Sequence, residues 1–197
     1  MVLAALLLAV AAWQGGAGLW LHGKAWLAQA LLSRAWAQAR AASAQDAGRA
    51  VRPWPWADTW PVARLTVPRL GVDHIVLSGV SGQAMAFGPA HVGASAAPGD
   101  DGNCVIGGHR DTHFAFLRAI EPGDSLRLER LDGRATLYVV RDAVILDAAR
   151  GAAPGLRLKP DGRWLTLVTC WPFDAIVAGG PGRYLIMAEA VDDQPAS

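Results

Sequence analysis

The longest apolar stretch of the chain lies at its N-terminus. From Val2 to Leu21 there is no charged side chain, and Gln14 is the one strongly polar residue. About 20 apolar residues are enough to cross a bilayer as a helix, so residues 1–22 are predicted to form a transmembrane anchor. A cleaved signal peptide is the alternative, although no convincing small-residue cleavage site stands where one would be expected.

The following stretch has the periodicity of a helix. Between Ala25 and Ala50, polar Arg34, Gln38 and Gln45 recur at roughly helical spacing and leave an apolar face. That face carries Trp26, Leu27, Leu31 and Trp36. The helix should end before the segment Pro53-Trp54-Pro55-Trp56, because proline removes a backbone donor and restricts the residue before it. Residues 23–59 are therefore predicted to be a helical stalk and a Trp/Pro-rich linker.

The role of the linker tryptophans stays open. They could lie at lipid headgroups, clamp the stalk onto the following domain, or simply pack against it. The sequence does not distinguish these three possibilities.

From Trp60 onward the pattern is typical of an all-β domain. Short runs of β-branched and aliphatic residues alternate with Gly, Pro and Asp turns such as Asp132-Gly133 and Asp161-Gly162. Seven or eight strands over residues 60–192 indicate a closed barrel or a sandwich. The predicted strands are Ala63–Val67, His74–Leu77, Asn103–Gly107, Ser125–Arg130, Ala135–Leu146 with a break near Arg141, Trp164–Cys170 and Arg183–Ala190.

Composition and charge narrow the choice of function. A chain of 197 residues with 52% hydrophobic residues can bury one good-sized core in addition to an anchor. A formal charge of +1 provides no basic surface for phosphate backbones, so no nucleic-acid partner is expected. Two cysteines are too few for a disulfide framework and lack the Cys-x-x-Cys spacing of a structural zinc site. Each cysteine therefore needs its own explanation.

Cys170 is the first candidate for chemistry. It ends the predicted strand Trp164–Cys170 and precedes Trp171-Pro172, which places the thiol at the rim of a sheet. A thiol attacks as the thiolate, so a catalytic cysteine needs an imidazole or a guanidinium close by. The alternative is an inert thiol that only fills space.

His109 is the best placed of five histidines to supply the imidazole. It follows an apolar strand within the segment Gly107-Gly108-His109-Arg110-Asp111-Thr112-His113, whose glycines allow a close approach of backbone or substrate. His113 is a competitor, and a purely structural histidine is the alternative for both. A metal site is not expected, because the segment lacks the glutamate of a His-Glu-x-x-His zinc helix and no third ligand has obvious spacing.

Arg183 opens the last predicted strand after the glycine-rich segment 179–182. A hairpin running back from Cys170 would bring Arg183 close to the thiol, where a guanidinium can stabilise an oxyanion or hold a carbonyl. Cys104 lies five residues before His109, so the two should point to opposite faces of a strand, and Cys104 is interpreted as core packing. A regulatory disulfide between the two cysteines is the alternative.

These features together resemble the sortase family of cysteine transpeptidases. Thr166-Leu167-Val168-Thr169-Cys170 is similar to the Thr-Leu-x-Thr-Cys motif of sortases, with the Gly-His-Arg segment at His109 upstream and Arg183 on the next strand. The resemblance covers about Trp60 to Ala190. Two further segments, 54–61 and Ala86-Phe87-Gly88-Pro89, look like the proteobacterial subgroup of the family.

The resemblance implies an eight-stranded β-barrel that faces the periplasm or exterior from a single N-terminal anchor in the cytoplasmic membrane. The implied reaction is attack of Cys170 on a Leu-Pro-x-Thr-Gly-like C-terminal sorting signal, followed by transfer of the thioacyl group to an amine acceptor. It implies Cys170, His109 and Arg183 as catalytic residues and no cofactor. The positive charges Lys24, Arg34 and Arg40 run against this orientation, because basic residues usually mark the cytoplasmic side.

Two other functions use the same residues differently. A hydrolytic cysteine peptidase of the cell envelope would pass the acyl group to water instead of an amine. A non-catalytic β-module of the envelope would have an unreactive Cys170.

Overall fold

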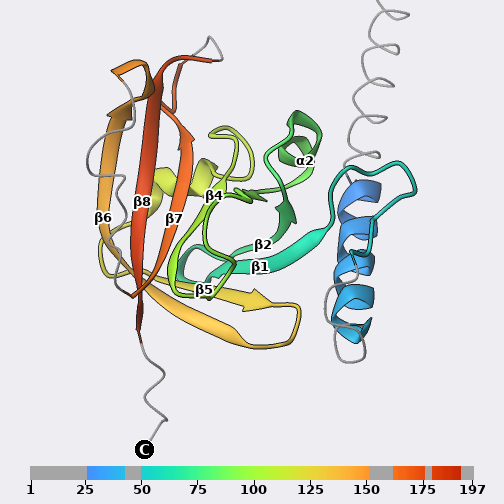
Figure 1. Cartoon of the computed structure of the whole chain (residues 1–197). Helices are drawn as coiled ribbons and strands as arrows, with labels where there is room; N and C mark the ends of the chain where they lie inside the picture. The colour runs from blue at the N-terminus through green and yellow to red at the C-terminus, as the bar shows by residue number, and fades with distance from the viewer. Residues whose placement is uncertain (1–25, 43–49, 151–161, 176–178, 192–197) are drawn as a thin grey trace, which may run out of the picture.

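The computed structural model describes residues 26–42, 50–150, 162–175 and 179–191, and the predicted transmembrane anchor, residues 1–22, lies outside them. Eight strands close into a barrel in the order β1-β2-β3-β4-β7-β8-β6-β5 (Figure 1). The strands are β1 (Pro61–Val67), β2 (Val72–Ser78), β3 (Ala90–His91), β4 (Gly102–Gly107), β5 (Ser125–Arg130), β6 (Ala135–Asp147), β7 (Arg163–Cys170) and β8 (Gly182–Val191). Short helices α2 (Gly82–Phe87), η1 (Pro68–Leu70), η2 (Ala115–Ala119) and η3 (Ala148–Arg150) connect some of them.

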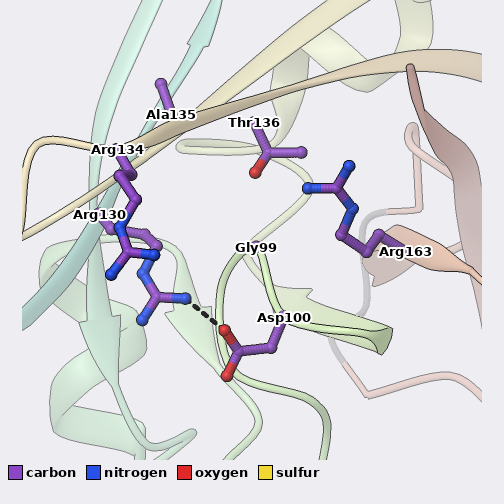
Figure 2. Close-up of a pocket in the computed structure, with 7 residues that line it drawn as sticks. All are labelled: Gly99, Asp100, Arg130, Arg134, Ala135, Thr136 and Arg163. Carbon is purple, nitrogen blue, oxygen red and sulfur yellow. Dashed lines mark hydrogen bonds and ion pairs between the residues drawn. The ribbon is translucent and has the colours of Figure 1, made fainter. Parts of the chain in front are cut away.

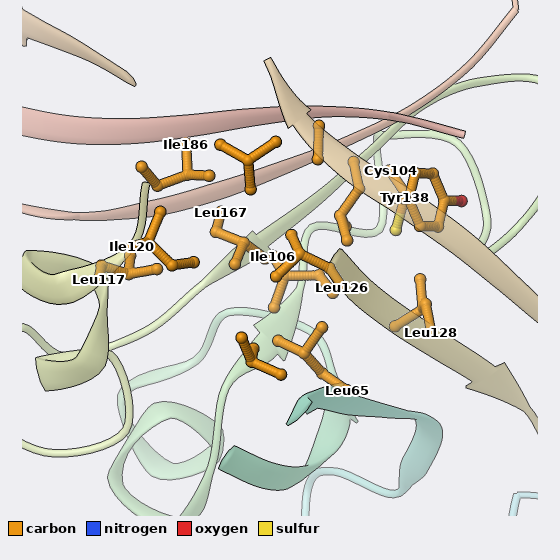
Figure 3. Close-up of a cluster of buried hydrophobic side chains, with 14 of the residues drawn as sticks. Leu65, Cys104, Ile106, Leu117, Ile120, Leu126, Leu128, Tyr138, Leu167 and Ile186 are labelled. Atoms are coloured by element: carbon orange, nitrogen blue, oxygen red, sulfur yellow. The ribbon is translucent and has the colours of Figure 1, made fainter. Parts of the chain in front are cut away.

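The core fills the inside of the barrel with aliphatic side chains. Every second residue of β1 is fully buried, as expected for a strand with one face on the core. Leu65, Ile106, Leu128, Leu167 and Ile186 come from five different strands and belong to one buried cluster (Figure 3). This alternation of buried and more exposed positions determines which side chains of a strand face outward, away from the core.

The strands predicted from the sequence are present, with ends that differ by one or two residues. The break predicted near Arg141 is a register shift of β6 against β8 between Val140 and Asp142. The Asp132-Gly133 turn joins the antiparallel strands β5 and β6, with Gly133 at a φ of 86°. Two elements were missed: β3, which has only two residues, and α2, which is too short to show a helical period.

Strands β6 and β7, which flank the Asp161-Gly162 segment in the sequence, do not pair with each other as a hairpin. Strand β7 pairs with β4 and β8, while β6 pairs with β5 and β8, so β8 separates β6 from β7. The pairing of β4 with β7 is parallel, as is that of β2 with β3, which makes the barrel mixed. Parallel neighbours need a long connection, and β4 and β7 come from distant parts of the chain.

A helix over residues 26–42 lies against the barrel on the side of β2 and α2 (Figure 1). Leu32 is buried in a small cluster with Leu77, Ala84 and Ala90, and Gln29 donates to the carbonyl of Phe87 at 2.8 Å. The helix lies within the predicted stalk and is docked on the domain. Over the described residues, no helix has both the length and the apolar character needed to cross a membrane.

The Trp/Pro-rich linker also touches the domain. The rings of Trp54 and Phe87 meet edge to face, with 4.9 Å between centroids. Trp56, in contrast, is 77% exposed. The linker therefore clamps to α2 through Trp54, whereas the contact made by Trp56 stays open.

Candidate active site

Cys170 and Arg183 stand directly opposite each other on neighbouring antiparallel strands. Residues in such a pair have Cα atoms about 4.5–5.5 Å apart and side chains on the same face of the sheet. Leu165 and Leu167 are buried inside the barrel, so Cys170, an odd number of positions away, points to the outer face. The predicted pairing of the strands that carry Cys170 and Arg183 is therefore confirmed, and the role of Arg183 stays a prediction.

His109 follows β4, the other neighbour of β7. Gly107 pairs with Val168 in the parallel ladder, and the amide of Gly108 continues this ladder by donating to the carbonyl of Val168 at 3.1 Å. Two further residues along each strand lead to His109 and Cys170, which sets them side by side. His109 is exposed, and three adjacent strands thus present an imidazole, a thiol and a guanidinium at the same end of the barrel.

The threonines of the Thr-x-x-Thr-Cys segment tie β7 to β4. Thr169 donates from Oγ1 to the carbonyl of Gly108 at 2.7 Å, and both groups are buried. Three residues earlier, Thr166 donates from Oγ1 to Oδ1 of Asn103 at 3.0 Å, again within the buried interior. The first hydrogen bond fixes the peptide that precedes His109, and the second fixes the opposite end of the same strand pair.

Gly108 must be a glycine because of its contact with Phe114. A Cβ at position 108 would lie 2.7 Å from the Phe114 ring. The loop then turns sharply, since the amide of Phe114 donates to the carbonyl of His109 at 2.9 Å. The buried aromatic ring and this hydrogen bond together hold the backbone of His109 in place.

Arg183 is held by the glycine-rich segment that precedes it. Its Nη1 donates to the carbonyls of Gly180 at 2.6 Å and Gly182 at 2.8 Å. Gly182 in turn packs tightly on the chain after the cysteine, because a Cβ there would lie 2.7 Å from the carbonyl oxygen of Trp171. The carbonyl of Gly182, which helps to position Arg183, therefore belongs to a residue whose close approach to Trp171 only glycine permits.

Three aromatic side chains gather where β7 ends and β8 begins. Trp171 stacks on Tyr184 with 5.6 Å between ring centroids, and Phe173 meets both rings edge to face. The guanidinium of Arg118 lies 5.3 Å from the centroid of the Phe173 ring. The Trp171–Pro172 peptide bond is cis.

A cavity of about 440 Å³ opens next to these residues. Its walls come from the end of β6, from the chain after Cys170 and from the start of β8. They include Ile145, Leu146, Asp147, Trp171, Pro172, Gly182 and Arg110. Most of this wall is apolar, and the volume suits several residues of a peptide.

Arg110 was not singled out from the sequence. It is 9% exposed, and its Nη2 donates to the carbonyl of Ala175 at 2.7 Å. This contact joins the loop that carries His109 to the loop that follows Cys170. The signal available in the sequence was an arginine directly after a candidate catalytic histidine.

His113, the competitor of His109, lies against a different partner. Its ring meets that of His74 at 5.7 Å between centroids. Burial lowers the pKa of both imidazoles, opposed by hydrogen bonds to the backbone of His113 for His74 and of Ala86 for His113. Among the described residues, no three His, Cys, Asp or Glu side chains gather as metal ligands.

Cys104 lies in the core as predicted. It is fully buried, and burial raises the pKa of its thiol to about 12. Its ladder partner is Leu165, five residues before Cys170, which corresponds to roughly 16 Å along the strand. A disulfide needs Cα atoms closer than about 7 Å, so the alternative of a regulatory disulfide is wrong for this fold, and both cysteines are free.

A rim cysteine between a histidine and an arginine, on a closed eight-stranded barrel, is typical of a cysteine acyltransferase. The family described as the sortase domain matches residues 65–191, which cover most of the barrel. The chain belongs to the sortase family.

Relatives and solved structures agree with this assignment. The chain is 29% identical to Sortase D of Bacillus subtilis over 127 residues, which cover 64% of this chain and 62% of that protein. It superposes on Sortase A of Corynebacterium diphtheriae with a TM-score of 0.62 and 24% identity, covering 72% of this chain and 66% of the other. A Sortase D5 transpeptidase of Clostridium perfringens gives a TM-score of 0.64 and 17% identity, with 84% and 98% covered. The last two likenesses show the fold alone, and membership of the proteobacterial subgroup stays a prediction.

Proposed function

We propose that this chain is a membrane-anchored transpeptidase in which Cys170 is the nucleophile, His109 the acid and base, and Arg183 the stabilising cation. The observation that carries the proposal is the register of three strands. The parallel ladder of β4 with β7 ends at Gly107 and Val168, two residues before His109 and Cys170, and Cys170 pairs with Arg183 across β7 and β8, which supports a shared site at this end of the barrel.

The first half of the reaction forms a thioester. The thiolate of Cys170 attacks the carbonyl carbon between Thr and Gly of a Leu-Pro-x-Thr-Gly-like signal, and the C–N bond breaks. His109 gives its proton to the departing amine. Arg183 donates from Nε or Nη2 to the oxygen of the tetrahedral intermediate, because Nη1 is engaged with the glycine carbonyls.

The second half transfers the acyl group to an amine acceptor. His109, now neutral, takes a proton from the incoming amine, which attacks the thioester and releases the thiolate. The apolar cavity next to Cys170 offers a binding surface for one of the two peptides, since it is bounded by residues that directly follow the thiol.

The proposal includes the cellular arrangement. Residues 1–22 would hold the enzyme in the cytoplasmic membrane as one span, residues 23–59 would be the stalk and linker, and residues 60–192 would be the catalytic domain on the periplasmic or outer side. The apolar run from Val2 to Leu21 supports the span, and the family supports the side.

The test uses the full chain in a nonionic detergent. It is incubated with a Leu-Pro-x-Thr-Gly peptide and triglycine, and the intact mass of the enzyme and of the products is measured for the wild type and Cys170→Ala. A thioacyl adduct and a triglycine-capped product in the wild type alone are expected. Normal processing by Cys170→Ala would refute the assignment of the nucleophile.

The same experiment separates the rival functions. An adduct that yields only the hydrolysed peptide, with triglycine in excess, would favour a cysteine peptidase. A folded chain that forms no adduct and labels slowly with iodoacetamide at every pH would favour a non-catalytic β-module.

A further inference from the structure

Five large apolar side chains are exposed on the described part of the chain, and three of them come from the segments that precede the barrel. Trp26 is 74% exposed, Leu27 53% and Trp56 77%. The other two are Val80 and Ile145. Large apolar side chains that gather on a surface usually mark a contact with another molecule. The first three therefore need a partner that the barrel itself does not provide.

The docked face of the helix over residues 26–42 does not include Trp26. The buried positions of this helix recur every three or four residues, as a single stripe requires, and are Ala28, Leu32, Ala35, Trp36 and Ala39. Each residue turns the helix by about 100°, so Trp26, two positions before Ala28, lies on nearly the opposite side. Packing of the helix on the barrel therefore does not explain Trp26.

The helix and the Trp/Pro-rich linker meet at Phe87, the last residue of α2. Gln29, which follows Trp26 by three residues, donates to the carbonyl of Phe87 at 2.8 Å. The ring of Trp54 meets the ring of Phe87 at 4.9 Å between centroids. Trp26 and Trp56 thus stand three and two residues away from two side chains that contact the same residue. The exposed side chains of the helix and the linker belong to one region of the surface.

Trp56 is presented by a fixed turn of the linker. The amide of Ala57 donates to the carbonyl of Trp54 at 3.0 Å, which closes the turn around Trp56. Directly after it, Asp58 accepts a hydrogen bond from Oγ of Ser81 at 2.8 Å. The exposure of the Trp56 indole is therefore a property of a turn that the domain holds in place.

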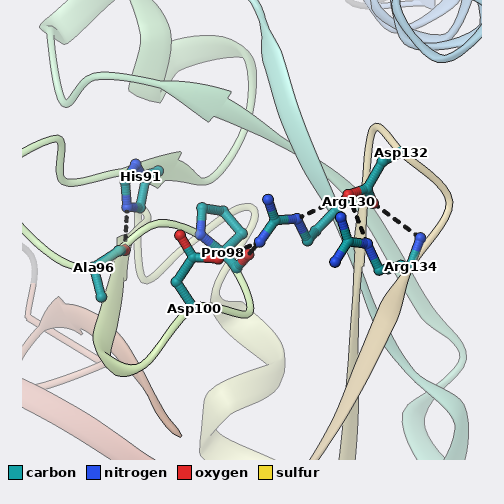
Figure 4. Close-up of polar contacts among 7 residues, drawn as sticks. All are labelled: His91, Ala96, Pro98, Asp100, Arg130, Asp132 and Arg134. Carbon is teal, nitrogen blue, oxygen red and sulfur yellow. Dashed lines mark hydrogen bonds and ion pairs between the residues drawn. The ribbon is translucent and has the colours of Figure 1, made fainter. Parts of the chain in front are cut away.

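The far end of the helix lies beside charged side chains instead. Arg40 pairs with Glu129 of β5 at 2.8 Å, which places this end of the helix at the β5–β6 hairpin. The charged residues that gather around the hairpin are Asp100, Arg130, Asp132, Arg134 and Arg163 (Figures 2 and 4). Figure 4 shows ion pairs of Arg130 with Asp100 and of Arg134 with Asp132. Such an end favours water, whereas the end at Trp26 presents apolar groups.

The sequence before Trp26 points to a lipid bilayer as the partner. The apolar run predicted to span the membrane ends at Leu21, and the five residues from there to Trp26 reach at most about 18 Å when fully extended. Trp26 therefore lies close to the surface of any bilayer that this run crosses. Lysine and tryptophan are typical of the ends of membrane spans, and Lys24 and Trp26 follow this pattern.

We propose that Trp26, Leu27 and Trp56 insert among the lipid headgroups of the membrane crossed by the N-terminal run and dock the domain on that membrane. This inference rests on the membrane anchor of the proposed function. Indole rings suit the headgroup region, because the ring is apolar while its N–H reaches water or a headgroup. The anchor tethers the chain at one point, and the two tryptophans from separate segments fix how the domain is turned.

The docked surface is connected to the candidate active site through α2. This helix lies between the helix over residues 26–42 and the loop after β4 (Figure 1). The backbone of Ala86, next to Phe87, is hydrogen-bonded to the imidazole of His113, in the loop that carries His109. Docking through the tryptophans therefore holds the loop of His109 at a fixed height above the membrane.

The test follows the full chain in vesicles of phosphatidylethanolamine and phosphatidylglycerol. Ala30 is exposed one turn after Trp26, so Ala30→Cys carries a fluorophore there while both tryptophans stay. Cys170→Ala is the background, and Cys104 is buried. Lipids with a nitroxide near the headgroup should quench this fluorophore. Iodide in water should quench it roughly threefold less than a fluorophore at Arg134→Cys, whose side chain is 82% exposed at the far end.

Trp26→Ser combined with Trp56→Ser tests whether the tryptophans cause this protection. Both side chains are exposed, so the Tm in detergent should stay close to that of the parent. In vesicles the variant should remain bound through its N-terminal run, and iodide quenching at residue 30 should rise to the level at residue 134. Ile145→Ser removes an exposed apolar side chain of β6 and is the matched control, which should keep the protection. An equal rise in this control would overturn the role of the tryptophans.

Flotation of the vesicles separates the inference from the proposed function. A chain that does not float with the vesicles would refute the membrane anchor and this inference with it. A chain that floats but leaves residue 30 as open to iodide as residue 134 would overturn the inference alone. Protection from iodide without quenching by the lipid nitroxides would assign the surface to a protein partner, such as a second copy of this chain, and would also overturn the proposal.

Discussion

The hydrogen bond from Thr169 to Gly108 links the fold directly to the candidate catalytic histidine. Thr169→Val keeps the branched shape of the side chain and removes the donor, leaving the buried carbonyl of Gly108 without this partner. An unsatisfied buried group of this kind costs about 1–3 kcal/mol of unfolding free energy. At about 2 kcal/mol the Tm should fall by roughly 4–8 °C for a chain of this size.

The effect on activity should exceed the effect on stability. The carbonyl of Gly108 belongs to the peptide that joins it to His109, so a shift of this peptide displaces the imidazole. A displacement of about 1 Å can reduce the rate up to about a hundredfold. We expect kcat for peptide transfer to fall roughly ten- to a hundredfold, with little change in KM, when both are measured well below the Tm.

Thr166→Val is the control for this experiment. It removes the same kind of donor from the same strand, and the lost partner is Oδ1 of Asn103. Thr166 lies four residues before Cys170, roughly 13 Å along β7, so a similar loss of Tm should come with an almost unchanged kcat. If Thr169→Val keeps the wild-type kcat, or if both variants lose it equally, the hydrogen bond does not position His109.

Three further predictions follow from close packing and burial in the barrel. Gly182→Ala should reduce the Tm and the transfer rate together, because its Cβ would lie 2.7 Å from the carbonyl oxygen of Trp171, as a thermal scan and a peptide assay would reveal. His74 and His113 have lowered pKa values in the fold because of burial, so the unfolded chain binds their protons first and stability should fall as the pH drops below about 6.5. Urea unfolding from pH 7.5 to 5 should show a smaller loss for His74→Gln, and an equal loss would contradict this reasoning. Cys104, whose pKa is raised to about 12, should resist iodoacetamide at pH 8 until urea unfolds the chain, while the rim cysteine reacts in the native state.

The strands could be predicted because each has one face on the core. Alternation along the segment that became β1 and the break near Arg141 in β6 were both visible in the sequence. β3 could not be found, because two residues show no period. The parallel pairing of β4 with β7 could not be predicted either, because it joins residues such as Gly108 and Thr169 that are 61 positions apart.

The candidate residues could be predicted for a different reason. Cys170 stood before a proline at the end of a strand, and Arg183 stood at the start of the strand that a hairpin would bring beside it. The contacts around these residues could not be predicted from the sequence, because they form only when the barrel closes. Examples are the hydrogen bond by which Arg110 bridges two loops and the stacking of Trp171 on Tyr184.

The parallel ladder between β4 and β7 also governs when the chain can become reactive. Contacts between distant parts of a chain form slowly, because the entropy of closing a long loop must be overcome first. A nascent or half-folded chain carries Cys170 as an isolated thiol, far from His109. A slip of the ladder by one residue would turn the thiol into the barrel. Under the proposed roles of Cys170 and His109, the barrel must therefore be complete before acyl transfer can begin.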